Sequence, residues 1–407
     1  MTTNGHSITT SSRAFAAFVV NIMHGIGHLN IQGIPILYPV LRDQFAFGYM
    51  GIAFLTLVTQ LVMGPMQITY GVLTRLARRF HILGISNALA FLGTVLIAAS
   101  QSYGYLIAGM ASRGLGISSY HPVGGAVMAS SFPQDRAKAL GLYQTTGNIG
   151  NLLAPLLVGA LLHMLGWRSV VIILGLPFIV ASMLCFLVKE PSLQAEYTAG
   201  KKESDRFGLR EYKALFQDRN SLILSLTMMV GAGGRGGGAI KAYLAVLLVD
   251  RFGISVSLAA VLFAAYTFGG ALGPLSMGWF SDRTSPLLAA RFNLMFSAVF
   301  IVLILVPEAP GVPLGVFVFL AGFFIASRST LLQTLLIQSG TQDARIDTQL
   351  SLYFTIGAVS GPVWTLLIGV LVDQFGMGVA ISTMAASYLL GMIILSFIRL
   401  DHQPGQS

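Results

Sequence analysis

The sequence predicts an all-α membrane protein with twelve transmembrane helices, arranged as two pseudo-symmetric six-helix bundles. Three observations support this prediction. The chain of 407 residues is 55% hydrophobic and only 10% charged, with a mean hydropathy of +0.76. Long apolar runs follow one another along it, and its two halves share a spaced pattern of residues. Soluble domains contain about 25% charged residues, so this composition is typical of a membrane protein.

Each predicted helix is an apolar run of about 20 residues or more, which is enough to cross a hydrocarbon core of roughly 30 Å. The turns between the runs contain Gly, Pro or charged residues. The first run is too long for the hydrophobic region of a signal peptide, so we expect it to be retained as a helix. The predicted spans are 14–41, 49–70, 81–101, 104–132, 138–165, 167–188, 220–249, 255–280, 287–307, 313–339, 347–373 and 376–398.

A charged segment divides the spans into two sets of six. We predict an N-terminal bundle at 1–188, a cytoplasmic linker at 189–219 and a C-terminal bundle at 220–407. The bundles are related in sequence, because Leu140, Leu142, Tyr143, Thr145, Gly147, Gly159 and Gly166 recur 210 residues later as Leu350, Leu352, Tyr353, Thr355, Gly357, Gly369 and Gly376. Parallel repeats of this kind place a substrate site at mid-membrane between the halves.

The loop charges predict the orientation. If both termini are cytoplasmic, most of the 24 Lys and Arg residues lie in cytoplasmic loops, as the positive-inside rule requires. We therefore expect a multi-pass protein of the cell (inner) membrane. The net charge of +9 does not predict nucleic-acid binding, because the basic residues do not form one exposed face. The single Cys185 excludes an intramolecular disulfide.

Four basic residues lie inside otherwise apolar stretches, and no Asp or Glu does. Charges at membrane depth are costly and usually functional. At 4 Å, two unit charges interact by about 4 kcal/mol at an effective dielectric near 20, so several cations favour an anion and repel an organic cation. A carboxylate, phosphonate or phosphate ester also suits bidentate Arg. The four residues are Arg113, Arg235, Lys241 and Arg328.

Polar residues on one face of the first helix form a second group of candidates. The spacing of His24, His28 and Gln32 places them on the same face. They either line a cavity or form hydrogen bonds between helices. In the fourth helix, Arg113 and Tyr120 lie on nearly the same face and His121 precedes Pro122. For Arg113 and His121 a structural role remains open.

The remaining candidate ligands come from later helices. Six glycines between Gly231 and Gly238 predict a break in the seventh helix, which a membrane protein tolerates where backbone is buried in protein or lines a wet cavity. The later candidates are Tyr143, Gln144, Asn148, Arg235, Lys241, Arg328 and Tyr353.

The sequence contains no phosphate-binding loop for ATP and no catalytic motif, and we expect no cofactor. We also expect no metal cluster, because His24 and His28 have no acid or Cys nearby in their helix.

The loop after the eighth helix reads Gly278-Trp-Phe-Ser-Asp282-Arg283 and resembles the cytoplasmic G-x-x-x-D-R motif of the major facilitator superfamily. The first-half copy departs from it, because Arg75 stands where the acid belongs. The segment from Arg113 to Pro122 and the His/Asn pattern of the first helix are similar to the fosmidomycin-resistance branch. The resemblance implies the fold of that superfamily and a cytoplasmic gate formed by Gly71, Arg75, Arg79, Gly278, Asp282 and Arg283.

We therefore expect a secondary transporter, not an enzyme, that moves a small organic anion by alternating access and works as a monomer in the lipid bilayer. Transport would be proton-linked, through His24, His28 or His121, or it would be an exchange with a counter-anion. The narrower resemblance implies an alternative, a drug or antibiotic efflux pump driven by proton antiport. A membrane receptor or scaffold that does not transport is a further alternative.

Overall fold

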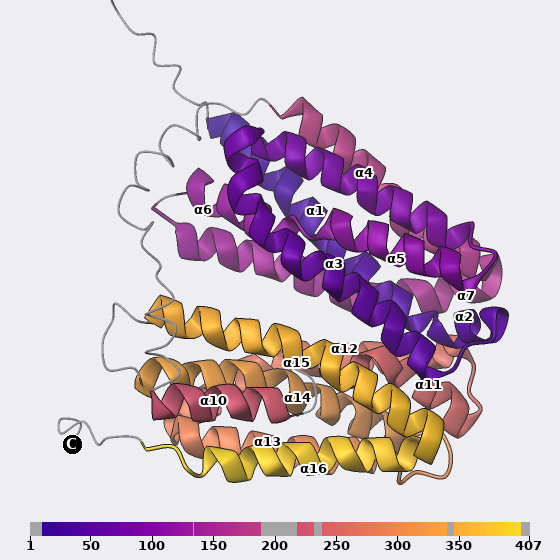
Figure 1. Cartoon of the computed structure of the whole chain (residues 1–407), viewed down its shortest axis with the longest axis vertical. Helices are drawn as coiled ribbons and strands as arrows, with labels where there is room; N and C mark the ends of the chain where they lie inside the picture. Colours follow the sequence, from indigo (N-terminus) through magenta and orange to yellow (C-terminus); the bar gives the residue numbers. More distant parts are fainter. Residues whose placement is uncertain (1–9, 133, 189–217, 232–237, 340–345, 400–407) are drawn as a thin grey trace, which may run out of the picture. The chain divides into compact units, whose positions relative to one another are not determined.

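The computed structural model describes residues 10–132, 134–188, 218–231, 238–339 and 346–399 (Figure 1). Within these ranges the regular secondary structure is helical and contains no strand. The charged linker predicted at 189–219 lies almost entirely outside the described residues, and Arg235 lies outside them too.

The contacts divide the chain into two compact units. Unit 1 comprises Met1–Leu37 with Leu55–Arg206, and unit 2 comprises Tyr38–Phe54 with Phe207–Ser407. The predicted boundaries placed 38–54 in the first bundle, whereas the contacts of this segment group it with unit 2. The reason is a set of polar contacts, described below, that no hydropathy pattern reveals.

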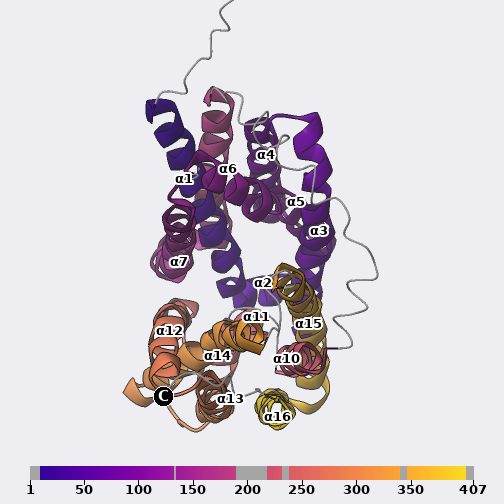
Figure 2. The same cartoon turned by 90° about the vertical axis from the view of Figure 1, so that its left-hand side faces the viewer.

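Unit 1 is built on two long helices that lie side by side, α1 (Thr10–Ile36) and α7 (Arg136–Leu187). Helix α4 (Arg79–Ala98) packs against both α5 (Tyr103–Ile117) and α7 (Figures 1 and 2). The other elements that contribute residues to unit 1 are α3 (Tyr49–Leu76), a π-helical segment η1 (Tyr120–Gly124) and α6 (Gly125–Ser131).

Two predicted spans of unit 1 meet at a sharp kink, and a third is interrupted. The spans predicted at 138–165 and 167–188 lie in the single element α7, which is kinked at Gly166, where φ is 72° and ψ is 162°. Glycine adopts such a positive φ at little cost, which explains why the turn needs no further residues. The span predicted at 104–132 is instead interrupted by η1, which contains Pro122. Proline has no amide hydrogen, so the regular helix breaks there.

Unit 2 contains the short helix α2 (Tyr38–Phe45) and the helices of the second half. Helix α14 packs against α12 and α13, while α16 packs against α13, α10 and α15 (Figure 2). Ser255 and Ser285 cap α12 and α13, each accepting a backbone N–H at 3.2 Å. The bounds are α10 (Arg219–Val230), α11 (Ile240–Phe252), α12 (Val256–Arg283), α13 (Pro286–Leu303), α14 (Val312–Ser339), α15 (Ile346–Phe375) and α16 (Met377–Leu395).

Eight segments of the described residues are long and apolar enough to cross a membrane. One of them, Lys138–Leu187, contains 50 residues and so accounts for two of the predicted spans. The span predicted at 220–249 appears as two shorter helices, α10 and α11, on either side of the glycine-rich residues. The predicted break in this helix thus coincides with the end of α10 at Val230, although 232–237 lie outside the described residues.

Candidate functional site

Three histidines from two elements of unit 1 form a cluster. His24 and His28 come from successive turns of α1, and His121 comes from η1. The ring centroid of His24 lies 4.5 Å from that of His28 and 5.2 Å from that of His121. The ring centroids of His28 and His121 are 5.7 Å apart. The sequence predicted each residue as a candidate but did not predict that His121 joins the pair on the first helix.

The hydrogen bonds of two of these rings fix the nitrogen that carries the proton. His24 Nδ1 lies 2.7 Å from the backbone carbonyl oxygen of Tyr143, and His28 Nδ1 lies 3.2 Å from Asn151 Oδ1. Both oxygens only accept hydrogen bonds, so each Nδ1 carries a hydrogen and donates it. In the neutral ring, Nε2 then holds the lone pair. His24 is fully buried, and its Nε2 has no hydrogen-bond partner among the described residues.

A buried tyrosine network supports this cluster. The ring of Tyr143 stacks on that of His24 with centroids 3.7 Å apart, and its hydroxyl donates to the backbone carbonyl of Tyr120 at 2.6 Å. The Tyr120 hydroxyl in turn donates to Asn87 Oδ1 at 2.8 Å. These bonds connect α7, η1 and α4, and so hold the π-helical segment that carries His121. Asn87 was not among the predicted residues, although it is a polar residue within an apolar helix.

Gly147 makes room for the two rings of α1. A Cβ at this position would lie 2.7 Å from His24 Cε1 and 2.9 Å from His28 Cδ2, closer than real Cβ atoms approach other atoms. Small residues let membrane helices approach closely. Here the glycine of α7 allows both imidazoles to pack directly on the helix backbone.

Arg113 lies in α5 and is buried, with only 3% of its surface exposed. Its guanidinium donates to Asn30 Oδ1 of α1 at 3.1 Å. The acceptor is a neutral amide, so this bond satisfies a donor without neutralising the guanidinium. Asn30 is a partner that the sequence did not single out, because it lies off the His24–Gln32 face.

Arg328 of α14 is a buried arginine of unit 2, although it is not at the repeat position of Arg113. It is 1% exposed, donates to the backbone carbonyl of Gly231 at the end of α10, and lies 5.5 Å from the ring centroid of Tyr388. Tyr353, the repeat equivalent of Tyr143, directs its hydroxyl to the carbonyl of Ser329 at 3.4 Å. In each unit, therefore, the equivalent tyrosine donates to a backbone carbonyl of the fourth or tenth predicted span. This agrees with the internal repeat.

The other predicted ligands are distributed differently. Gln32 is buried on α1, Lys241 is half-buried in the first turn of α11, and Gln144 and Asn148 are exposed on α7. Their assignment as ligands stays a prediction.

The predicted gate residues lie near the ends of helices. Gly71 and Arg75 are exposed near the end of α3, whereas Arg79 is buried and donates to Ser130 Oγ at 3.2 Å. At the end of α12, Asp282 is exposed, and Arg283 lies 3.7 Å from the ring centroid of Trp279, a cation–π contact. The gating role of these residues, including Gly278, stays a prediction.

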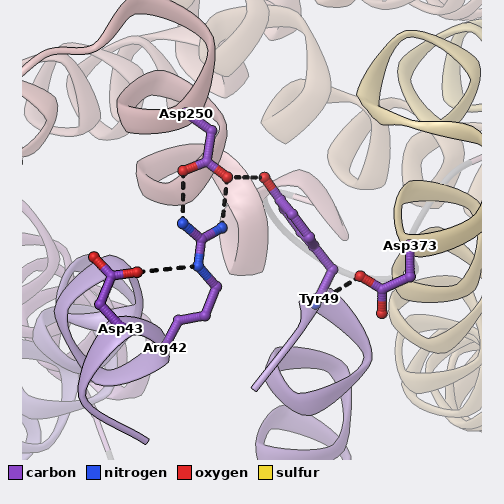
Figure 3. A network of polar contacts seen from close by, with 5 residues as sticks. All are labelled: Arg42, Asp43, Tyr49, Asp250 and Asp373. Atoms are coloured by element: carbon purple, nitrogen blue, oxygen red, sulfur yellow. Dashed lines mark hydrogen bonds and ion pairs between the residues drawn. The ribbon is translucent and has the colours of Figure 1, made fainter. Parts of the chain in front are cut away.

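A second polar network, which the sequence did not predict, lies in unit 2 (Figure 3). Arg42 of α2 forms two bonds with Asp250 of α11, at 2.5 and 2.7 Å, and the Tyr49 hydroxyl also donates to Asp250. Asp373 of α15 accepts the backbone N–H groups of Tyr49 and Met50 at 2.9 and 2.8 Å, at the beginning of α3. These bonds explain why 38–54 group with unit 2.

The network lowers the pKa of Asp250. Burial works in the opposite direction, but the hydrogen bonds from Arg42 and Tyr49 and the charge of Arg42 outweigh it. The same bonds raise the pKa of Arg42. The ionised pair is therefore the stable form at neutral pH.

The expectation of no metal cluster stays a prediction. It considered ligands within the first helix only, whereas the structure brings one ring nitrogen of each of His24, His28 and His121 to within 4.8 Å of one another. Three histidines from separate segments form a donor set that could hold a metal ion, and the sequence spacing alone does not reveal it.

Comparisons with known proteins agree with this fold. The "Fosmidomycin resistance protein" of Escherichia coli K12 is 23% identical over 382 residues, covering 92% of this chain and 91% of its own. The "Cis,cis-muconate transport protein" of Acinetobacter baylyi is 24% identical over 300 residues, 72% of either chain. A solved bacterial homologue of the human lysosomal transporter Spinster has a TM-score of 0.71 at 17% identity, covering 96% of both chains.

The nucleoside transporter NupG is a further structural neighbour, with a TM-score of 0.70 at 14% identity over 95% of this chain and 98% of its own. At such identities the likeness concerns the fold. The family model described as Major Facilitator Superfamily matches residues 15–365. The chain is thus a multi-pass membrane transporter rather than an enzyme, and it belongs to the Major Facilitator Superfamily.

Proposed function

We propose that this transporter carries a small organic anion across the cell (inner) membrane by alternating access. One observation carries the proposal: two buried arginines of apolar helices, Arg113 and Arg328, donate to neutral oxygens, those of Asn30 and Gly231. Charges buried in a membrane protein are costly and usually functional. A carboxylate or phosphonate suits such a site, because it can accept two hydrogen bonds from one guanidinium.

One relative supports a substrate of this class, and a second bears on the direction of transport. One is named as a transport protein for cis,cis-muconate, which is a carboxylate, and the other is named for resistance to fosmidomycin. Resistance would follow if the direction of transport were outward. Export by proton antiport is therefore the second candidate function, and the direction of transport separates it from uptake.

In the mechanism that we propose, the two helical bundles rock about a substrate bound at mid-membrane. Both termini would lie in the cytoplasm, where the loops that begin at Gly71 and Gly278 would contact helix ends, and one chain would suffice. Transport would be coupled either to a proton or to a counter-anion. A pH gradient drives accumulation in the first case, and an anion loaded on the opposite side drives it in the second.

The test is uptake of a radiolabelled dicarboxylate by liposomes that contain the purified full-length protein. We expect saturable uptake that a related phosphonate inhibits and that an organic cation does not. The proposal would be contradicted if the liposomes showed no saturable uptake and no inhibition by any anion, across dicarboxylates and phosphonates in both membrane orientations.

Variants of Arg328 separate a charge effect from a structural one. Because Arg328 also anchors the end of α10, we compare Arg328→Gln, which removes the charge, with Arg328→Lys, which keeps the charge but loses the planar fork. We expect Arg328→Gln to abolish uptake and Arg328→Lys to retain part of it, with both variants monodisperse in detergent. Equal uptake by Arg328→Gln and wild type would remove Arg328 from the site.

A further inference from the structure

Three histidine side chains of unit 1 lie close enough together to bind one metal ion after small side-chain rotations, a role that is separate from anion transport. His24, His28 and His121 each offer one ring nitrogen, and these nitrogens lie within 4.8 Å of one another. A tetrahedral zinc ion with Zn–N distances near 2.0–2.1 Å brings its ligand nitrogens to about 3.3 Å from each other. Closing the remaining gap requires shifts of about 1 Å in the side chains, which rotation of the rings can supply.

The second coordination sphere is already present. Histidines that bind metals almost always donate their other N–H to a carbonyl or carboxylate, which fixes the tautomer and turns the lone pair toward the metal. His24 donates Nδ1–H to the Tyr143 carbonyl at 2.7 Å, and His28 donates Nδ1–H to the Asn151 side-chain oxygen at 3.2 Å. In both neutral rings, Nε2 is thus the nitrogen that keeps a lone pair for a metal ion.

The His24 Nε2 atom supplies an independent indication of a ligand. His24 is 0% exposed, and its Nε2 has no hydrogen-bond partner within the described part of the chain. A buried polar atom without a partner costs about 1–3 kcal/mol, so such atoms are rare unless something else binds there. The stacked ring of Tyr143 and the backbone at Gly147 hold the imidazole in this position.

The third ligand lies at an exposed position on an irregular element. His121 is exposed and belongs to the π-helical segment η1, a type of element that is frequent at functional sites. The cluster is thus buried at His24 and open at His121, which gives an ion a path of entry. Imidazole nitrogen suits Zn²⁺, Ni²⁺ and Cu²⁺, and hard ions such as Mg²⁺ prefer oxygen ligands.

We propose that His24, His28 and His121 form a three-nitrogen site for a divalent transition-metal ion of the zinc type. Three protein ligands leave a fourth coordination position open, as in zinc sites that bind exchangeable ligands. An anionic oxygen could occupy that position. Metal binding itself does not depend on the anion-transport proposal, so each can fail without the other.

The experiment measures metal binding to the purified full-length protein in detergent, after removal of any polyhistidine tag. The protein is stripped with a chelator and dialysed against buffered free Zn²⁺, and bound metal is counted by mass spectrometry. We expect one Zn²⁺ per chain in the wild type. We expect His28→Gln and His121→Gln each to weaken the affinity at least about tenfold.

His81→Gln and His163→Gln serve as matched controls, because both residues are exposed and lie outside the cluster. They should bind Zn²⁺ as the wild type does. Cobalt substitution provides a readout of geometry: a tetrahedral site gives intense visible absorption that His121→Gln should abolish. Size-exclusion profiles and helical circular dichroism show that each variant is folded.

Three results would overturn the proposal: no stoichiometric Zn²⁺ in the wild type, equal affinity in the wild type and both cluster variants, or loss of binding in a control variant alone. The outcome is independent of transport, because no substrate is present. Uptake measured in chelator-treated liposomes then reports on the anion proposal separately.

Discussion

The imidazole of His24 lies flat against the phenol ring of Tyr143, with centroids 3.7 Å apart and an interplanar angle of 15°, and it also donates to the backbone carbonyl of the same residue at 2.7 Å. One residue of α7 thus fixes both the position and the tautomer of a buried histidine of α1. The same tyrosine holds η1 through its hydroxyl. The positions of His24 and of η1, which carries His121, therefore both depend on Tyr143.

The first prediction concerns the Tyr143 hydroxyl. Tyr143→Phe keeps the stacked ring and the carbonyl but removes the hydrogen bond to the Tyr120 carbonyl. We expect a loss of about 1 kcal/mol in the free energy of unfolding, measured as a lower Tm in detergent. Tyr105→Phe is the control, because Tyr105 is 56% exposed. Equal Tm values for the two variants would contradict this role.

The second prediction concerns the glycine under the histidine rings. Gly147→Ala places a Cβ 2.7 Å from His24 Cε1, and such overpacking costs about 1–3 kcal/mol. The matched control is Gly141→Ala on the same helix, where a Cβ meets nothing within 4 Å. Because alanine favours a helix over glycine, we expect Gly141→Ala to keep or raise the Tm, while Gly147→Ala lowers it. A Tm for Gly147→Ala at or above that of Gly141→Ala would show that the rings do not pack there.

The third prediction concerns the ion pair that joins 38–54 to α11. Arg42 and Asp250 form two parallel hydrogen bonds. A bidentate pair of this kind stabilises a protein more than an ordinary exposed ion pair does. We expect Arg42→Ala and Asp250→Ala to be non-additive in a double-mutant cycle, with a coupling energy of about 1 kcal/mol from thermal unfolding. Additive losses would indicate that the two side chains do not interact in the membrane protein.

The fourth prediction concerns the pH dependence of the same pair. The pKa of Asp250 is lowered in the folded chain, so the stabilisation is fully present above the ordinary value of 3.8 and is lost as the pH falls through the folded value. The Tm difference between wild type and Asp250→Asn should therefore be constant between about pH 5 and 8 and shrink below about pH 4. A difference that already declines near neutral pH would contradict the lowered pKa.

Apolar runs predicted the helices well because a membrane span needs only length and hydropathy. They also separated 138–165 from 167–188, and the structure confirms a sharp kink between them at Gly166, where φ is 72°. The same signal could not place 38–54 with unit 2. That grouping depends on Arg42, Tyr49 and Asp250, polar residues at helix ends whose partners lie about two hundred positions apart.

The candidate site was predictable in part. Helical spacing placed His24 and His28 on one face, and the structure confirms that their rings are neighbours. It could not add His121, because His121 lies on η1, and spacing within one helix does not say which other segment packs against it. Buried partners such as Asn30 and Asn87 were also missed, since helix packing across the unit decides which amide meets Arg113 or Tyr120.

The central claim is that this transporter binds a small organic anion. The most direct measurement is a thermal-shift series on the detergent-solubilised protein with three ligands of one carbon skeleton: a dicarboxylate, its neutral diamide and the corresponding diamine. At a concentration of 100 times the dissociation constant, binding stabilises by about 2.7 kcal/mol, so we predict a Tm rise for a dicarboxylate and none for its amide or amine. A panel in which only the diamines or diamides raise the Tm would contradict the account.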